Sequence, residues 1–179
     1  MTNEGEVPAK EIQEVVLKDD IWKWQSEQRR PNWDEFFMML AEVAATRSTC
    51  DRGPNQRFRD HKGTGAVIVS KDNRRIAMGY NGSPPGVPHC DDIGHRLVDS
   101  HCVSTLHAEE NAILNSTFNL EGCKIYSTTI PCFDCCKRII AVGIVEVVFQ
   151  HTYTSRYDSQ DLGIALLKLR GLHPRRLLL

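Results

Sequence analysis

The chain has 179 residues, of which 41% are hydrophobic and 25% charged, and its formal net charge at pH 7 is −1. This length suits one domain with a hydrophobic core, and the balanced charge gives no overall attraction to nucleic acid or to an anionic membrane. No apolar run reaches the roughly 18 residues that a membrane-spanning helix needs, and the first residues lack the basic and apolar stretches of a signal peptide. We therefore expect a cytoplasmic protein in which the seven cysteines are metal ligands, catalytic groups or buried thiols rather than disulfides.

The N-terminal part of the chain differs in composition from the rest. Residues 1–30 are charged and predict a partly helical extension, whereas residues 31–179 predict the folded domain. A first helix is expected after Pro31, with Asn32 or Asp34 as its N-cap, because apolar residues recur there at helical spacing. These residues are Phe36, Phe37, Leu40, Val43 and Ala44.

The remaining segments alternate between strands and helices. Short apolar runs bounded by turn residues predict strands, and longer amphipathic stretches predict helices. In chain order we expect a loop at 51–63, strands at 64–70 and 74–82, an irregular segment at 83–95, a helix at about 104–116, a strand at 123–129, a helix at 131–143, a strand at 144–150 and a helix at about 159–170. The last helix carries Leu162, Ala165, Leu166 and Leu169 on one predicted face. This order predicts an α/β domain in which helices cover a sheet.

Two short motifs contain an imidazole, an acid and three thiols. The motif HAE contains His107 and Glu109, and the motif PCFDCC contains Cys132, Cys135 and Cys136. Cys132 and Cys135 are three positions apart near the expected start of a helix, so both thiols lie on one face near its N-terminus. Zinc prefers imidazole and thiolate ligands, and catalytic zinc sites keep one position open. We therefore predict a catalytic zinc bound by His107, Cys132 and Cys135, with Cys136 as a small core residue.

Glu109 gives this predicted zinc site a catalytic character. Zinc lowers the pKa of bound water from about 15.7 to about 7, and an adjacent carboxylate that is not a ligand can then move the proton. The pattern HxE followed by PCxxC resembles the signature of the zinc-dependent nucleobase deaminases. The alternative is a structural zinc site, or buried thiols beside a surface acid.

Five segments extend the resemblance beyond the metal motifs. They are RPNW (30–33), RSTC (47–50), GYNGSPPG (79–86), HCVSTLHAEENAIL (101–114) and PCFDCCKRII (131–140). Together they resemble the deoxycytidylate (dCMP) deaminases over about residues 30–160. The resemblance implies a cytidine deaminase-like three-layer α/β/α fold, with a central mixed sheet of about five strands and helices on both faces. It also implies that a zinc-activated water, with Glu109 as proton shuttle, hydrolyses dCMP to dUMP and ammonia for thymidylate synthesis.

The same resemblance assigns nucleotide-binding roles to the GYNG segment. It implies a homohexamer that dCTP activates and dTTP inhibits, with Gly79, Tyr80 and Gly82 at the effector site. Asn81, whose amide can donate and accept hydrogen bonds, is expected to contact the sugar, and Ala108 is expected to contact the substrate. From the residues alone, Asn81-Gly82 is also the typical centre of a type I′ hairpin turn.

A nucleotide monophosphate requires cationic or N–H contacts. The candidates are Arg47, at the end of the first helix, and Tyr153 with Arg156, after the last core strand. Each arginine can equally be a solvated surface charge. The basic segment 51–63 is either a solvated loop or an extension of the phosphate or effector site.

Three further cysteines are predicted to bind a second, structural metal. They lie far apart in the sequence, unlike the ligands of a local zinc finger. Members of the resembled family that are similar to bacterial and phage types carry a second zinc in these segments. The resemblance implies the ligands Cys50, Cys90, His101 and Cys102, with His89 or His95 as alternatives. The other interpretation is three buried free thiols.

Two other functions share parts of this pattern. A tRNA adenosine deaminase has the same metal ligands and acid, but it needs a basic surface along the phosphates, and the net charge of −1 argues against it. A catalytically inactive protein that binds zinc and nucleotides would keep the ligands without turnover, and the presence of Glu109 argues against that. We therefore expect dCMP as substrate, a homo-oligomer, and no membrane or nucleic acid partner.

Overall fold

The structure is a computed structural model, and it describes residues 30–51, 57–58, 61–99, 101–153 and 159–179. The predicted extension at 1–30 lies almost wholly outside this part of the chain, as do Arg156 and much of the 51–63 loop. Asn32–Leu179 form one compact unit. Within the described residues, no helix is both long and apolar enough to cross a lipid bilayer.

A five-stranded mixed sheet forms the centre of the domain, in the order β4-β3-β7-β8-β9. Strand β3 pairs antiparallel with β4 and β7, whereas β7, β8 and β9 run parallel to one another. The strands are β3 (Gly65–Val69), β4 (Ile76–Tyr80), β7 (Lys124–Thr129), β8 (Glu146–His151) and β9 (Arg175–Arg176). The first four overlap the predicted strand segments, and the expectation of a mixed sheet of about five strands is confirmed.

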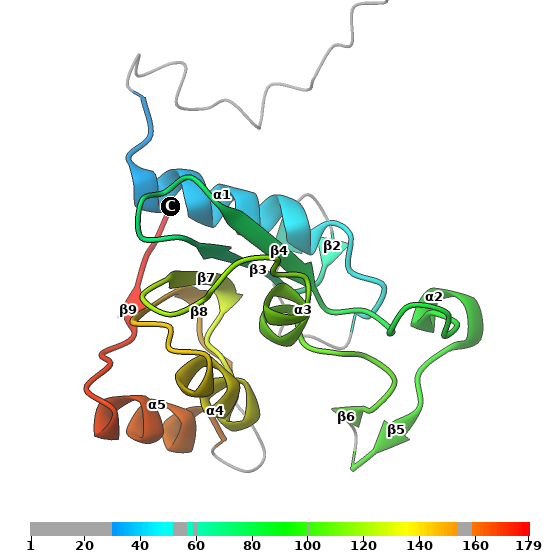
Figure 1. Cartoon of the computed structure of the whole chain (residues 1–179). Helices are drawn as coiled ribbons and strands as arrows, with labels where there is room; N and C mark the ends of the chain where they lie inside the picture. Colours follow the sequence, from blue (N-terminus) through cyan, green and yellow to red (C-terminus); the bar gives the residue numbers. More distant parts are fainter. Residues whose placement is uncertain (1–29, 52–56, 59–60, 100, 154–158) are drawn as a thin grey trace, which may run out of the picture. The chain divides into compact units, whose positions relative to one another are not determined.

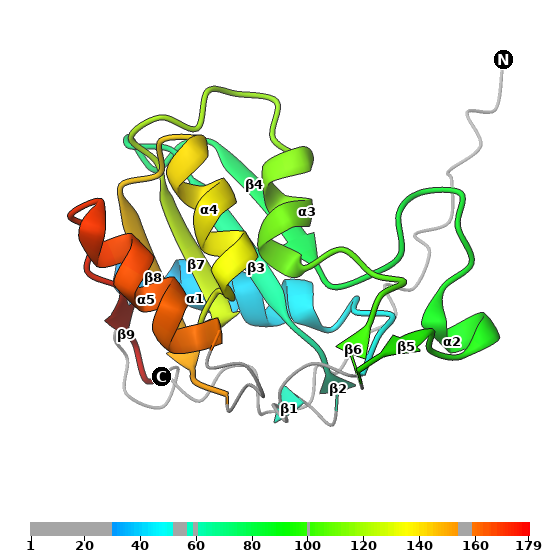
Figure 2. The same ribbon diagram turned by 90° about the horizontal axis from the view of Figure 1, so that it is seen from below.

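Helices cover both faces of this sheet, so the domain has three layers (Figures 1 and 2). The helices are α1 (Trp33–Ala45) on one face, and α3 (Ala108–Leu114), α4 (Phe133–Ala141) and α5 (Ser159–Leu169) on the other. Because successive side chains of a strand alternate between faces, the central strands contribute to two cores. Val67 and Tyr126 pack with α1, while Ile68 and Ile125 pack with α3 and α4.

A capping box at Asn32 explains where α1 begins. The Asn32 side chain accepts a hydrogen bond from the Glu35 N–H at 3.0 Å, and the Glu35 carboxylate accepts one from the Asn32 N–H at 2.8 Å. Two backbone donors at the start of the helix are thereby satisfied. Asp34, the other predicted cap, instead accepts a hydrogen bond from the Tyr126 hydroxyl at 2.7 Å and joins α1 to β7.

Close packing of α3 on the edge strand β4 sets the position of the predicted active site. A Cβ atom on Gly79 would lie 2.3 Å from the Ala108 carbonyl oxygen, so only glycine permits this approach. The Asn111 side chain on α3 donates to the Tyr80 carbonyl oxygen at 2.7 Å. This bond satisfies a backbone acceptor at the end of a strand that has no partner strand on its outer side.

The buried face of α5 is not the predicted one. Leu162 and Leu169 are 55% and 87% exposed, whereas Gly163 and Leu167 are buried. Gly163 packs against the start of α4, where a Cβ atom at this position would lie 3.0 Å from the sulfur of Cys136. Apolar residues occur on several sides of α5, so their spacing could not select the face that this close contact selects.

Several short elements occur where the sequence predicted loops. The segment after β4 contains a four-residue helix and a hairpin of two-residue strands, and the predicted loop 51–63 contains two further short strands. These elements are α2 (Cys90–Ile93), β5 (Leu97–Val98), β6 (His101–Cys102), β1 (Arg57–Phe58) and β2 (His61–Lys62). Together α2, β5 and β6 form an arm that extends away from the sheet (Figure 2).

Candidate active site and a second metal-ligand group

His107, Cys132 and Cys135 come together where two helices begin. His107 is the N-cap residue of α3, Cys132 is the N-cap residue of α4, and Cys135 lies in the first turn of α4. The three ligand atoms all lie within 4.8 Å of one another, and Nδ1 of His107 is 3.4 Å from each sulfur. Two sulfurs and one imidazole nitrogen match the donor set of a catalytic zinc site that keeps one position open. These residues, the first ligand group, therefore fit zinc.

Hydrogen bonds within the first ligand group separate the pKa values of its members. The single proton of the Cys135 thiol has the sulfur of Cys132 and Oε2 of Glu109 as acceptors. The hydrogen bond with Cys135 and the nearby His107 lower the pKa of Cys132 to about 4. The hydrogen bond to Cys132 raises the pKa of His107 to about 9. The bond to Cys132, together with burial, raises the pKa of Cys135. At neutral pH Cys132 is therefore a thiolate, His107 an imidazolium and Cys135 a thiol, so a metal that binds all three displaces two protons.

Glu109 lies beside the first ligand group, in the first turn of α3, and is only 3% exposed. Its carboxylate oxygen Oε2 is 3.6 Å from the sulfur of Cys135, and Oε1 is 3.3 Å from the hydroxyl oxygen of Ser127 on β7. Burial raises the pKa of Glu109. A buried carboxyl group next to a zinc-ligand group has the location that a proton shuttle needs.

Two other buried side chains border the first ligand group. Cys136 is the core residue that the sequence predicted: it is fully buried, burial raises its pKa to about 12, and its sulfur lies 3.5 Å from the Pro131 carbonyl oxygen. Ser127 was not identified by sequence reasoning. A signal was available, because Ser127 follows Ile125 by two positions in a predicted strand and so shares its buried face.

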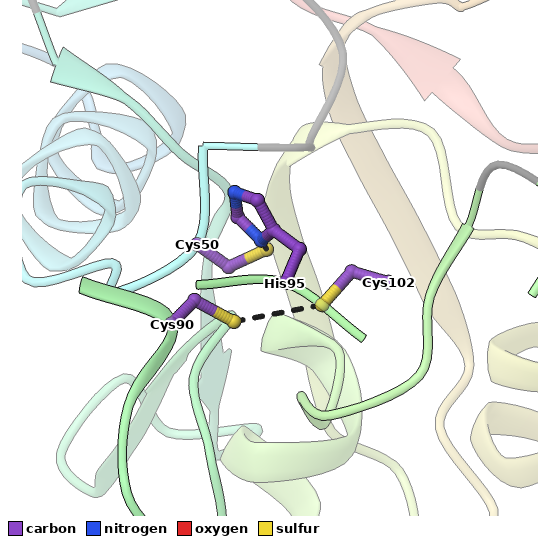
Figure 3. A group of neighbouring side chains, drawn as sticks. All are labelled: Cys50, Cys90, His95 and Cys102. Carbon is purple, nitrogen blue, oxygen red and sulfur yellow. Dashed lines mark hydrogen bonds between the residues drawn. The ribbon is translucent and has the colours of Figure 1, made fainter. Parts of the chain in front are cut away.

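A second group of metal-binding side chains joins the chain after α1 to the arm. Cys50, Cys90, His95 and Cys102 hold their ligand atoms within 4.8 Å of one another, and Figure 3 shows the four side chains converging. The sulfurs of Cys90 and Cys102 are 3.5 Å apart, and Nδ1 of His95 is 3.7 Å from the sulfur of Cys50. Three sulfurs and one nitrogen form the four-ligand set of a closed, structural zinc site. These residues are the second ligand group.

Asp51 sets the orientation of His95 in the second ligand group. Its carboxylate lies 2.9 Å from Nε2 of His95, which leaves Nδ1 directed at the sulfurs. Metal-binding histidines commonly donate their other ring nitrogen to a carboxylate in this way. Burial opposes ionisation of Cys102, but hydrogen bonds with the Ser104 N–H, His95 and Cys90 lower its pKa to about 6. The group therefore contains a thiol that ionises readily.

The histidine in the second ligand group is His95, the predicted alternative, and not His101. Cys102 and His101 are neighbours in β6, and adjacent side chains of a strand point to opposite sides. Since Cys102 faces the group, His101 faces away from it. His89, the other alternative, has its Nδ1 atom 3.0 Å from the Thr49 hydroxyl and is not part of the group.

The Asn81 side chain is enclosed by hydrogen bonds and is only 7% exposed. Its Oδ1 accepts from the Ser48 hydroxyl at 2.6 Å and from the Thr64 N–H at 2.7 Å. Its Nδ2 donates to the Cys50 carbonyl oxygen at 2.7 Å. The one proton of the Ser48 hydroxyl also has the Cys50 and Asn81 carbonyl oxygens as acceptors, at 2.9 and 3.0 Å. Oδ1 therefore keeps the Thr64 N–H as its fixed donor, and Nδ2 keeps one N–H for a ligand. The expected contact of Asn81 with the sugar stays a prediction.

The type I′ turn considered for Asn81-Gly82 does not form. That turn needs a positive φ at both central residues, and neither residue has one. Instead Gly82 exchanges two backbone hydrogen bonds with Leu106, at 3.2 and 2.9 Å. This bridge connects the segment after β4 to the residue before His107.

The remaining predicted site residues belong to neither ligand group. Ala108 is buried at the first position of α3, and Tyr80 is half-buried at the end of β4. Arg47 is exposed after α1, and Tyr153 is half-buried after β8. Arg156 lies outside the described residues. Their roles toward a nucleotide stay predictions.

Residues 31–151 match the family model described as the cytidine and deoxycytidylate deaminase zinc-binding region. ComE operon protein 2 of Bacillus subtilis is 43% identical over 136 residues, which cover 74% of this chain and 67% of that protein. The deoxycytidylate deaminase of Saccharomyces cerevisiae is 35% identical over 173 residues, which cover 91% of this chain and 50% of the yeast protein. The chain thus spans about half the length of the yeast relative.

A solved structure with the same fold comes from a cyanophage. The dCMP deaminase of cyanophage S-TIM5, in complex with dCMP and dUMP, matches with a TM-score of 0.63 and 29% sequence identity. The match covers 83% of this chain and 99% of the phage chain. The three-layer arrangement expected from the sequence is therefore confirmed, and the matched family segment contains both ligand groups.

Proposed function

Because the chain belongs to the cytidine and deoxycytidylate deaminase family, we propose that it hydrolyses dCMP to dUMP and ammonia. The observation that carries this proposal is the buried carboxyl group of Glu109 beside a group of three zinc-type ligands. A relative named deoxycytidylate deaminase, and the dCMP and dUMP in the cyanophage complex, support dCMP as the substrate. The product dUMP then supplies thymidylate synthesis.

In this proposal His107, Cys132 and Cys135 hold a zinc ion. Zinc bound there supplies Lewis acidity, which allows water to lose a proton near neutral pH. Glu109 accepts that proton and donates it to the cytosine ring nitrogen. It then takes the second proton of the added water oxygen and delivers it to the departing amino group. The oxygen of water replaces the amino group on the ring, and ammonia leaves. Burial of Glu109, which raises its pKa, suits a group that takes up a proton and returns it.

The proposed substrate contacts follow from hydrogen-bonding capacity and charge. Asn81 donates its remaining N–H to an acceptor atom of the nucleotide sugar. A monophosphate requires cationic or N–H partners, and we assign these to Arg47, Tyr153 and Arg156. The other proposed contacts are Ala108 for the substrate and Gly79, Tyr80 and Gly82 for an effector nucleotide.

A second, structural zinc is proposed in the second ligand group. The four donors within 4.8 Å and the contact between Asp51 and His95 support it. A metal there holds the arm against the chain after α1 and stabilises the fold without entering the reaction. Metal analysis of the purified protein measures the number of bound zinc ions directly. We expect two zinc ions per chain.

A homohexamer with dCTP as activator and dTTP as inhibitor is a further proposal, which rests on family membership. Exposed apolar side chains on α1 support self-association: Trp33 is 59% and Val43 51% exposed. Exposed apolar side chains can mark a surface that another chain covers. Sedimentation velocity gives the oligomeric state, and initial rates with added dCTP or dTTP give the sign of regulation. The expected cytoplasmic location stays a prediction.

The first test is ammonia release by the zinc-loaded protein from dCMP, deoxycytidine, dCTP or an adenosine-containing tRNA stem-loop. We expect turnover of dCMP, and its loss in a Glu109→Ala protein that keeps its zinc. Turnover of the tRNA alone would assign the chain to the adenosine deaminases. Nucleotide binding without ammonia release, even with dCTP as activator, would indicate a non-catalytic protein.

A further inference from the structure

Ser127 is a polar residue at a buried position of β7, and the proposed mechanism gives it no role. Its side chain is 0% exposed to solvent. Because Ser127 follows Tyr126, which faces α1, it points to the opposite side of the sheet, toward α3 and α4. A buried hydroxyl group destabilises a fold unless it makes hydrogen bonds. The partners of Ser127 therefore indicate what its hydroxyl does.

The hydroxyl of Ser127 lies between a backbone donor and a carboxylate. The Thr129 N–H donates to Oγ of Ser127 at 3.5 Å, and this Oγ donates to Oε1 of Glu109 at 3.3 Å. Since the N–H occupies an acceptor position of Oγ, the single hydroxyl proton is left for the carboxylate. The other carboxylate oxygen, Oε2, lies 3.6 Å from the sulfur of Cys135 and is thus the oxygen beside the first ligand group.

Cys135 cannot hold Glu109 in the zinc-loaded protein. A thiol that becomes a zinc ligand loses its proton, so it no longer donates a hydrogen bond to a carboxylate. Ser127 is not a ligand and keeps its proton. Of these two side chains, Ser127 is therefore the one that still donates to Glu109 when zinc is bound.

We propose that Ser127 is a positioning residue for Glu109, a role that rests on the proposed deaminase function. Its hydroxyl holds Oε1 and so fixes the rotation of the carboxylate. Oε2 is then the oxygen that exchanges protons with water and the base. Loss of this fixed geometry slows proton transfer without changing the groups that bind the nucleotide.

Steady-state kinetics of dCMP hydrolysis by the zinc-loaded protein test this role. Ser127→Ala should lower kcat by about tenfold, the effect of losing one hydrogen bond to a charged group, with KM unchanged. Ser127→Thr and Ser127→Val are a matched pair of similar shape, of which threonine keeps the hydroxyl. Threonine should retain more activity than valine. A wild-type kcat in Ser127→Ala, or equal activity of threonine and valine, would overturn the proposal.

A double-mutant cycle separates an effect through Glu109 from a general effect on the fold. In a Glu109→Ala background, measured in single turnovers at high protein concentration, Ser127→Ala should cause no further loss of rate. A further loss equal to that in the wild-type background would overturn the positioning role.

Zinc content and thermal unfolding of each variant, expected to match the parent, are readouts independent of turnover. If the wild type releases no ammonia from dCMP, the proposed function itself fails, which is recognisable before any Ser127 variant is compared.

Discussion

The side-chain nitrogen of Asn81 donates a hydrogen bond of 2.7 Å to the backbone carbonyl oxygen of Cys50, a member of the second ligand group. Asn81 is followed by Gly82, which pairs with Leu106, the residue before His107 of the first ligand group. A short series of amide and backbone contacts therefore connects the two groups. The second group is placed to hold Asn81, the proposed sugar contact, as well as the arm.

Replacing Asn81 by aspartate tests this connection. Asn81→Asp keeps an acceptor for the Thr64 N–H, but it places an oxygen where Nδ2 donates to the Cys50 carbonyl oxygen. We expect the free energy of unfolding to fall by about 2–4 kcal/mol, because the Cys50 carbonyl oxygen then faces a carboxylate oxygen in place of its amide donor and a charge becomes buried. Zinc binding in the second ligand group should weaken in parallel. Urea titration and zinc analysis measure the two effects.

Asn119→Asp is the matched control for this substitution. The Asn119 side chain acts as an acceptor, from the Glu121 N–H at 3.0 Å, so an aspartate keeps the bond. Its stability should stay within about 0.5 kcal/mol of the parent. If the two aspartate variants were equally stable, the hydrogen bond from Asn81 to Cys50 would not contribute to the free energy of unfolding.

Zinc binding to the first ligand group should release about two protons at neutral pH. The pKa of Cys132, about 4, means that this thiol is already ionised, whereas the pKa of His107, about 9, means that the imidazole still carries its proton. Cys135, whose pKa is raised, supplies the second proton. Affinity should therefore rise about a hundredfold per pH unit between about pH 5 and 8, above the pKa of Cys132 and below that of His107.

Calorimetry in two buffers of different ionisation enthalpy counts these protons. A Cys50→Ser/His95→Ala variant confines the measurement to the first ligand group. Release of three protons would mean that Cys132 is a neutral thiol before zinc binds, in conflict with the hydrogen bonds described for it. Release of one would mean that either His107 or Cys135 has already lost its proton before zinc binds.

The first ligand group could be predicted from the sequence because its members belong to two local motifs. Each motif lies at the start of a helix, and His107 and Cys132 are both N-cap residues. The central strands were predictable for a similar reason, since a run such as Ala66–Val69 is buried on both faces and interrupted by turn residues. In these cases the pattern within about ten residues decides the structure.

Features set by contacts between distant segments could not be predicted in this way. The choice of His95 over His101 follows from the register of a two-residue hairpin, which pairs Leu97 with Cys102. Ser127 gains its partner only when β7 lies beneath α3, and no local pattern records that placement. The buried face of α5 depends likewise on the contact of Gly163 with α4.

Replacing the histidines of the arm one at a time distinguishes the two arrangements of the second ligand group. His95→Ala removes a ligand, so about half of the bound zinc should be lost, whereas His101→Ala should retain it all. Asp51→Asn should weaken zinc binding in this group about 10- to 100-fold, because Nε2 of His95 loses its carboxylate partner. Competition with a chromophoric chelator measures all three. Loss of zinc in His101→Ala with retention in His95→Ala would restore the assignment first made from the sequence.

Gly79→Ala tests whether the contact of α3 with β4 holds Glu109 in place. The added Cβ atom would lie 2.3 Å from the Ala108 carbonyl oxygen, a backbone atom that moves only if α3 moves. We expect a loss of about 3 kcal/mol in stability and a lower kcat, because Glu109 lies in the first turn of the displaced helix. Met78→Ala, at the adjacent and 49% exposed position, is the control and should change both quantities little. Thermal unfolding and dCMP turnover measure the difference between the two variants. If both variants behaved alike, α3 would shift at little cost in free energy, and Gly79 would not set the position of Glu109.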